Sequence, residues 1–364
     1  MRHHEFSVVY TDRALHHAAP EFMAALSDTV DILRSAYSAP HATVVPGTGT
    51  AGMESVARQF ATGRRVLILQ NGLFSYRWRQ ILDASGAAAE YRVLCARQGD
   101  DRGWSPAPLD EVLAEIEAFA PDVVCAAQVE TSAGILLPPE YIAAVGAATR
   151  AAGGLFVLDA IAAGCLWTDL GATDVDVLIS APQKTWGGSP CGAFVVMSDR
   201  ARARLAPSTT FSGDLSAWLR VSENAEQGVA DYHATMPTDT IARNVAVMQE
   251  VRAEGFTRCT DLQGELGRKA RAALEQRGFA SVAADGAQAP SVVVSYAEAP
   301  DMVARLDAAG IRVSAGVPLH CGEGADFRTF RIGLFGLTKL RDIDGTIADL
   351  STALDAAAGG VPTG

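Results

Sequence analysis

The chain has 364 residues, of which 49% are hydrophobic, so it is long enough to bury a large core and to form two domains. Its net charge of −12 and its pI near 5.0 argue against nucleic acid or a membrane as a partner. It contains no run of about 18 uncharged apolar residues, and its first residues lack the apolar segment of a signal peptide. We therefore expect an enzyme located in the cytoplasm.

The six cysteines are scattered and form no C-x-x-C pair, which predicts neither a metal site nor a disulfide framework. Cys95, Cys125 and Cys191 lie in or beside apolar strands, where core packing is the expected role. Cys321 differs, because it lies in a glycine-rich loop, residues 317–324.

Apolar strand-like runs alternate with helical patterns up to about residue 255. The expected strands are 6–10, 42–45, 66–69, 123–127, 155–159 and 176–180, and the expected helices are 20–38, one opening near 51, 109–119 and 141–152. Strands that alternate with helices of this length indicate a mostly parallel sheet with helices on both faces.

The pattern changes after residue 255. The expected elements are helix 262–276, strand 292–296, helix 302–309, strands 311–314 and 329–334, and helix 340–356. These form a compact α+β unit, so we expect an N-terminal arm (1–15), a large α/β domain (16–255), a smaller C-terminal domain (256–358) and a disordered tail (359–364). In strand 329–334 the period of two places Arg331 on the face opposite Phe330 and Ile332.

Residues 46–50 form a turn rich in glycine and hydroxyl groups that leads into a helix. Such a turn presents free N–H groups and the positive end of the helix dipole, which suit a phosphate, although many turns of this kind are ordinary connections. Phe74 follows the strand 66–69 and is placed either to cover a planar ligand or simply to pack.

Lys184 follows the strand 176–180, at the edge where open α/β sheets bind ligands. The only other lysines, Lys269 and Lys339, lie in patterns typical of exposed helix faces. A crowded lysine loses its proton readily and reacts with aldehydes. Asp159 ends the preceding strand and fits a carboxylate that keeps a pyridine nitrogen protonated. The alternative is a structural ion pair between Lys184 and Asp159.

Taken together, several segments resemble the class V aminotransferases, which are fold-type I pyridoxal phosphate enzymes, and are most similar to the alanine-glyoxylate and serine-pyruvate aminotransferases. The segments are Gly47-Thr48-Gly49-Thr50, Asn71-Gly72-Leu73-Phe74, Glu130-Thr131-Ser132-Ala133-Gly134, Val157-Leu158-Asp159-Ala160, Ser180-Ala181-Pro182-Gln183-Lys184, Tyr232-His233-Ala234-Thr235-Met236-Pro237 and Phe330-Arg331-Ile332-Gly333-Leu334. They occur in the family's order from about residue 42 to about 350. The resemblance implies a large domain with a mostly parallel, seven-stranded sheet flanked by helices, and a smaller α+β domain.

The resemblance also implies roles for individual residues. Lys184 is similar to the lysine that bonds covalently to pyridoxal 5'-phosphate and shuttles protons, and Asp159 to the partner of the pyridine nitrogen. The remaining matches are Phe74 for the ring-stacking aromatic, Thr131 for the donor to the ring oxygen, Thr48, Gly49, Thr50 and Gln183 for the phosphate site, Tyr232 and Thr235 for residues that reach the neighbouring subunit's phosphate in a homodimer, and Arg331 for the arginine that binds the substrate carboxylate.

The expected activity is transfer of the amino group of serine or alanine to glyoxylate or pyruvate. The family's Pro-Gly-Pro-type turn near the N-terminus is absent, since residues 10–15 read Tyr-Thr-Asp-Arg-Ala-Leu, and this puts the substrate in question. One alternative is a cysteine desulfurase or β-lyase that uses Cys321. Others are a class V transaminase with 2-aminoethylphosphonate or aspartate as donor, and a catalytically silent binding protein.

Overall fold

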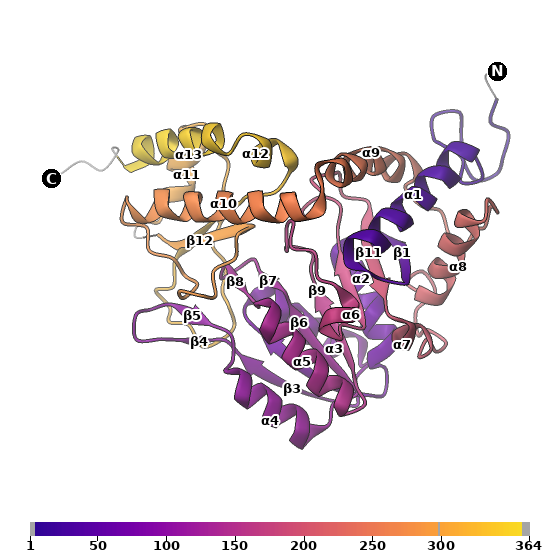
Figure 1. Ribbon diagram of the computed structural model, residues 1–364, viewed down its shortest axis with the longest axis horizontal. Coiled ribbons are helices and arrows are strands. Elements are labelled where there is room, and N and C mark those ends of the chain that lie inside the picture. The colour runs from indigo at the N-terminus through magenta and orange to yellow at the C-terminus, as the bar shows by residue number, and fades with distance from the viewer. Residues whose placement is uncertain (1–3, 298, 359–364) are drawn as a thin grey trace.

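The computed structural model describes residues 4–297 and 299–358. Figure 1 shows a central sheet between helices and, toward the upper left, a smaller layer of helices over a three-stranded sheet. No helix in the described residues is long and apolar enough to cross a membrane.

The central sheet has seven strands in the order β1-β11-β10-β9-β6-β2-β3. Neighbouring strands are parallel except at β11, which is antiparallel to both β1 and β10. The strands are β1 (His41–Pro46), β2 (Arg65–Gln70), β3 (Glu90–Cys95), β6 (Val123–Ala127), β9 (Leu155–Asp159), β10 (Val177–Ser180) and β11 (Gly192–Met197). The expected α/β fold with a mostly parallel seven-stranded sheet is therefore confirmed.

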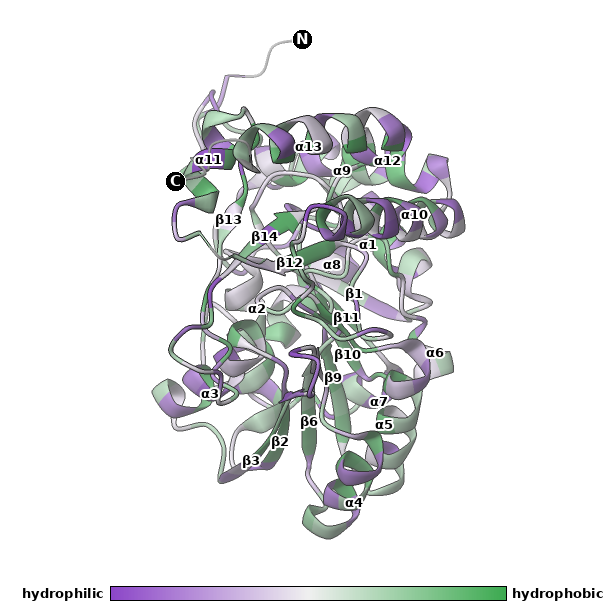
Figure 2. Ribbon diagram, turned by 90° about the vertical axis from the view of Figure 1, so that its left-hand side faces the viewer, coloured by the Kyte–Doolittle hydropathy of each residue, from purple (hydrophilic) through white to green (hydrophobic). Residues whose placement is uncertain are grey.

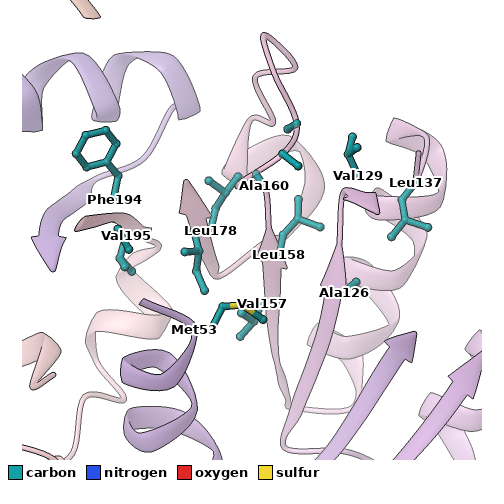
Figure 3. Packing of buried hydrophobic residues seen from close by; sticks show 14 of the residues in the cluster. Met53, Ala126, Val129, Leu137, Val157, Leu158, Ala160, Leu178, Phe194 and Val195 are labelled. Carbon is teal, nitrogen blue, oxygen red and sulfur yellow. The ribbon is translucent and has the colours of Figure 1, made fainter. Parts of the chain in front are cut away.

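Helices cover both faces of this sheet, which explains why its inner strands are continuous apolar runs (Figure 2). Apolar side chains of β9, β10 and β11 pack around Met53 of α2 (Figure 3). The helices are α1 (Pro20–Tyr37), α2 (Gly49–Val56), continued by a π-helical turn η1 (Ala57–Ala61), α3 (Leu73–Ser85), α4 (Leu109–Phe119), α5 (Pro139–Ala151), α6 (Leu170–Thr173), α7 (Asp199–Arg202), α8 (Leu215–Glu226) and α9 (Thr238–Glu254). Two short pairs, β4 (Arg97–Gln98) with β5 (Trp104–Ser105) and β7 (Val129–Glu130) with β8 (Ile135–Leu136), lie outside the sheet.

The C-terminal part packs helices on a small sheet of order β12-β14-β13. Its elements are α10 (Phe256–Glu275), β12 (Val292–Tyr296), α11 (Met302–Ala308), β13 (Ser314–Ala315), β14 (Thr329–Gly333), α12 (Leu337–Arg341) and α13 (Ile343–Ala358). As the alternation in β14 predicts, Phe330 and Ile332 are buried while Arg331 lies on the other face and is partly exposed.

Three expected elements differ from the structure. Residues 6–10 form no strand in the structure, because no neighbouring strand pairs with them, and Phe6 and Val8 are exposed. The strand expected at 311–314 is reduced to β13. The last helix is two helices broken at Asp342, whose carboxylate accepts the Gly345 N–H at 3.0 Å and caps α13.

Two smaller differences concern boundaries and burial. α10 begins at Phe256, six residues before the expected helix. Cys125 and Cys191 are buried as expected, whereas Cys95 is only partly buried, because β3 is the edge strand of the sheet. The tail 359–364, expected to be disordered, lies outside the described residues.

Candidate active site

One pocket gathers most of the predicted site residues at the carboxyl ends of the central strands. β9 and β10 run parallel with Asp159 opposite Ile179, so Asp159 stands at the edge beyond which the chain continues to Lys184. Pocket residues named by the sequence prediction are Thr48, Gly49, Thr50, Phe74, Thr131, Asp159, Gln183 and Lys184, and they are joined by Met53, Arg77, Val129, Ile161 and Ala162. Eight residues from five separate segments therefore converge as predicted.

The N-terminus of α2 forms one wall of the pocket. Thr48 is the N-cap, and its hydroxyl accepts the N–H of Ala51 at 3.2 Å. A Cβ on Gly49 would stand 2.6 Å from the Cδ1 atom of Ile161, so glycine keeps the backbone of this turn open to the pocket. The side-chain oxygen of Gln183 is buried without a hydrogen-bond partner. A rotated Gln183 amide, the threonine hydroxyls and the helix amides are the donors that an anion needs.

Asp159 is buried, and its Oδ1 atom accepts the Ile161 N–H at 2.9 Å. Burial raises the pKa of Asp159 to about 6, against the opposing effects of that hydrogen bond and of Lys184. Burial likewise lowers the pKa of Lys184, with Asp159 opposing the shift and Arg77 adding to it. The pocket thus holds an acid and an amine whose pKa values are moved toward each other, as is typical of functional sites.

Three basic side chains surround Phe74. The distances to its ring centroid are 5.2 Å from Lys184 Nζ, 5.1 Å from Arg77 Cζ and 5.7 Å from Arg331 Cζ. Arg331 donates from Nε to the carbonyl of Ala315 at 2.9 Å, which orients the guanidinium from β14 of the C-terminal part. Arg331 is thus close to the pocket, although it is not among the lining residues.

Sequence reasoning missed Arg77. Its Nη1 atom donates to the hydroxyl of Thr50 at 3.1 Å, so α3 contributes a cation to the same wall as α2. The signal was its position three residues after Phe74 at the start of a helix, which places both on one face.

Tyr232 and Thr235 do not line the pocket of their own chain. Both are exposed, and their hydroxyl groups lie 3.0 Å apart.

Cys321 is not among the residues that line the pocket. Its Sγ atom is 3.5 Å from the carbonyl oxygen of Gln70, at the end of β2 and beside Cys95 of β3. Contact with the Cys95 thiol and burial raise the pKa of Cys321, which works against a thiolate nucleophile. The loop is held by Glu323, whose carboxylate accepts the N–H groups of residues 319–321.

The two remaining lysines are unsuited to the pocket. Lys269 pairs with Glu265 and Asp344, each at 2.8 Å, and Lys339 is exposed on α12. Within the described residues, Lys184 is the lysine that lines this pocket.

Comparison with known proteins places these features in a family. The model of the family "Aminotransferase class-V" matches residues 3–344. The 2-aminoethylphosphonate–pyruvate transaminase of Burkholderia pseudomallei (strain K96243) is 29% identical over 339 residues, covering 89% of this chain and 86% of the relative. Among solved structures, the alanine–glyoxylate aminotransferase of Nostoc sp. superposes with a TM-score of 0.80 at 23% identity, covering 94% of this chain and 89% of the other. The ureidoglycine-glyoxylate aminotransferase of Bacillus subtilis superposes with a TM-score of 0.78 at 22% identity, covering 96% and 89%.

The fold and the pocket define a pyridoxal phosphate-dependent enzyme of fold type I. The chain belongs to the class V aminotransferase family. The predicted enzyme class and cofactor are therefore confirmed.

The pocket fits pyridoxal 5'-phosphate residue by residue. The Gln183 amide, rotated so that its NH2 group faces the pocket, and the open turn at Gly49 suit its phosphate. Asp159 suits its ring nitrogen and Phe74 its ring face. When bound, the cofactor supplies the electron sink for chemistry at the substrate Cα atom.

Proposed function

We propose that this aminotransferase passes an amino group from a small amine donor to a small 2-oxo acid such as pyruvate or glyoxylate. The observation that supports it is the convergence of Lys184, Asp159 and Phe74 in one pocket with Arg331 at its edge. Lys184 holds the cofactor covalently and then moves protons, since burial favours its neutral amine. Asp159 pairs with the protonated ring nitrogen.

Arg331 binds the carboxylate of the 2-oxo acid. Its Nε atom is engaged by Ala315, which leaves the two terminal nitrogens to form a bidentate pair with a carboxylate. Within the described residues no acidic side chain forms an ion pair with Arg331, so the guanidinium is not neutralised by the protein.

Two classes of donor are in question. Serine and alanine are the donors expected from the resemblance noted in the sequence. 2-Aminoethylphosphonate is the second candidate, because the curated relatives that share 28–29% identity over most of this chain are transaminases for that amine and pyruvate. A compound that serves as donor should convert the absorbance of the bound cofactor to that of the cofactor's amine form in a single turnover. We would assign as the donor the compound with the highest conversion rate at equal concentration. If none of the three compounds converts the cofactor, the proposal is contradicted.

The covalent role of Lys184 has a direct test. Borohydride reduction of the wild-type enzyme followed by peptide mapping should place the cofactor on Lys184. A label on Lys269 or Lys339 would contradict the assignment.

We also propose a homodimer with shared sites. Tyr232 and Thr235 are exposed on their own subunit, which suits residues that serve a neighbouring pocket. Mixing an inactive Lys184→Ala chain with an inactive Thr235→Ala chain should restore part of the activity, because one hybrid site has both residues intact. A fully active monomer in sedimentation would contradict this proposal.

A further inference from the structure

Glu130 is a buried carboxylate to which neither the sequence prediction nor the proposed chemistry gives a role. It ends β7 and has no exposed surface. Oε1 accepts the Phe74 N–H at 3.2 Å, the Ser132 N–H at 3.1 Å and the Ser132 hydroxyl at 2.6 Å. Oε2 accepts the Ser75 N–H at 2.9 Å and its hydroxyl at 2.7 Å. Five donors therefore converge on one carboxylate.

The same group of side chains holds the whole first turn of α3. The N–H groups of Asn71 and Gly72 donate to the Ser75 hydroxyl at 2.7 and 3.1 Å, and that of Leu73 donates to the Ser132 hydroxyl at 3.0 Å. Every backbone N–H from residue 71 to 75 thus ends on Glu130 or on a hydroxyl bonded to it. A carboxylate at this point also satisfies the positive end of the helix dipole.

This arrangement bears on the reacting centre in two ways. Glu130 binds the backbone of Phe74, whose ring lies 5.2 Å from Lys184 Nζ. It also adds a negative charge near Lys184, where Asp159 acts in the same direction and the guanidinium groups of Arg77 and Arg331 act in the opposite one.

We propose that Glu130 is a positioning residue for the cofactor: its carboxylate holds the first turn of α3 so that the Phe74 ring keeps its place over the cofactor ring. The negative charge of Glu130 also favours the protonated Lys184 nitrogen. The inference rests on the proposed roles of Lys184 and Phe74. Glu130 is not among the residues that line the pocket, so it acts on the reaction through the position of Phe74 and through its charge.

The test replaces Glu130 by the isosteric, neutral glutamine. In Glu130→Gln the amide NH2 group faces N–H donors, so at least one of them loses its acceptor. The holoenzyme should show a weaker visible circular dichroism of the cofactor, because the ring is held less firmly. The midpoint of its pH-dependent absorbance change should move down by about half a pH unit or more, because a nearby negative charge is lost. We expect kcat to fall by about ten-fold to a hundred-fold, with a smaller change in KM for the 2-oxo acid.

Asp176→Asn is the matched control for a purely structural role. Asp176 is also a buried carboxylate with several donors, including the Phe156 N–H at 2.9 Å and the Arg200 guanidinium, but it does not line the pocket. It should lower the thermal midpoint without moving the absorbance midpoint. Equal absorbance shifts in Asp176→Asn and Glu130→Gln would overturn the proposal.

Two further outcomes bear on the role of Glu130. If Glu130→Gln does not fold, Ser132→Ala, which removes one of the five donors and leaves the Glu130 charge in place, should show the weaker circular dichroism in smaller measure without the shift of the absorbance midpoint. Wild-type circular dichroism in Ser132→Ala would then overturn the proposal. If borohydride labels Lys184 in the wild-type enzyme while Glu130→Gln keeps wild-type spectra and kcat, only the role of Glu130 fails. If the label is elsewhere, the proposed function itself fails.

Discussion

Asp159 should make the cofactor-free protein less stable at neutral pH than a neutral side chain would. Its pKa is raised from 3.8 to about 6 because the carboxyl group is buried. The stability associated with this group is therefore fully present below pH 3.8 and is lost as the pH rises through about 6. A difference of about two pH units, at about 1.4 kcal/mol each, corresponds to about 3 kcal/mol at pH 7.5.

Asp159→Asn should thus raise the free energy of unfolding of the cofactor-free protein by up to about 3 kcal/mol at pH 7.5. The amide oxygen of asparagine can still accept the Ile161 N–H, so the fold keeps that hydrogen bond. Urea titrations at pH 7.5 and near pH 4 measure the difference, which should nearly disappear at the lower pH. Added cofactor should stabilise the wild type more than the variant, because only a carboxylate pairs with the protonated ring nitrogen.

The control is Asp176→Asn, in which the variant loses a buried ion pair with Arg200 and should be less stable than the wild type. The reasoning is refuted if cofactor-free Asp159→Asn is no more stable than the wild type at pH 7.5. It is refuted equally if the gain is the same at both pH values, since the charge on Asp159 would then not be its cause.

Three further predictions follow from the site. Gly72→Ala should destabilise the protein by about 1 to 3 kcal/mol in urea unfolding, because its Cβ would stand 2.1 Å from the Ser132 hydroxyl; an unchanged midpoint would show that the turn yields freely. Arg331→Lys should raise KM for the 2-oxo acid and lower kcat/KM, because the bidentate pair is lost; the loss should correspond to about 2 kcal/mol or more of transition-state stabilisation. An unaltered KM in steady-state kinetics would contradict this prediction. Cys321→Ser should leave kcat/KM within about two-fold, because the thiol contacts Gln70 and Cys95 rather than the pocket; loss of activity with sulfide as a product would revive the desulfurase alternative.

The sequence predicted the elements whose pattern does not depend on distant contacts. β6, β9 and β12 begin and end where the apolar runs do, because a strand buried on both faces tolerates few polar residues. The break in the last helix was not predictable in this way. It depends on Asp342 acting as a cap, and a period of 3.6 continues across such a break without a visible change.

The site shows the same division. Asp159 and Lys184 could be located from sequence because each follows an apolar strand, and the sheet brings such ends together. Glu130 could be recognised only as part of a motif. Its role depends on donors 55 and 56 residues earlier, which become neighbours only when β7 packs beside α3.

Folding and cofactor binding are coupled through the buried charge of Asp159. Before the cofactor binds, the ionised carboxylate destabilises the fold by about 3 kcal/mol at neutral pH, because burial raises its pKa from 3.8 to about 6. A ligand that binds only the folded protein stabilises it by about 2.7 kcal/mol when its concentration is 100 times Kd. These two free energies are similar, so cofactor at about 100 times its Kd offsets the destabilisation caused by the buried Asp159 carboxylate. The same burial leaves the carboxylate available to the ring nitrogen, since water does not compete for it. In the role proposed for Asp159, the residue that weakens the cofactor-free fold is the one that would give the folded state its selectivity for a cationic ring.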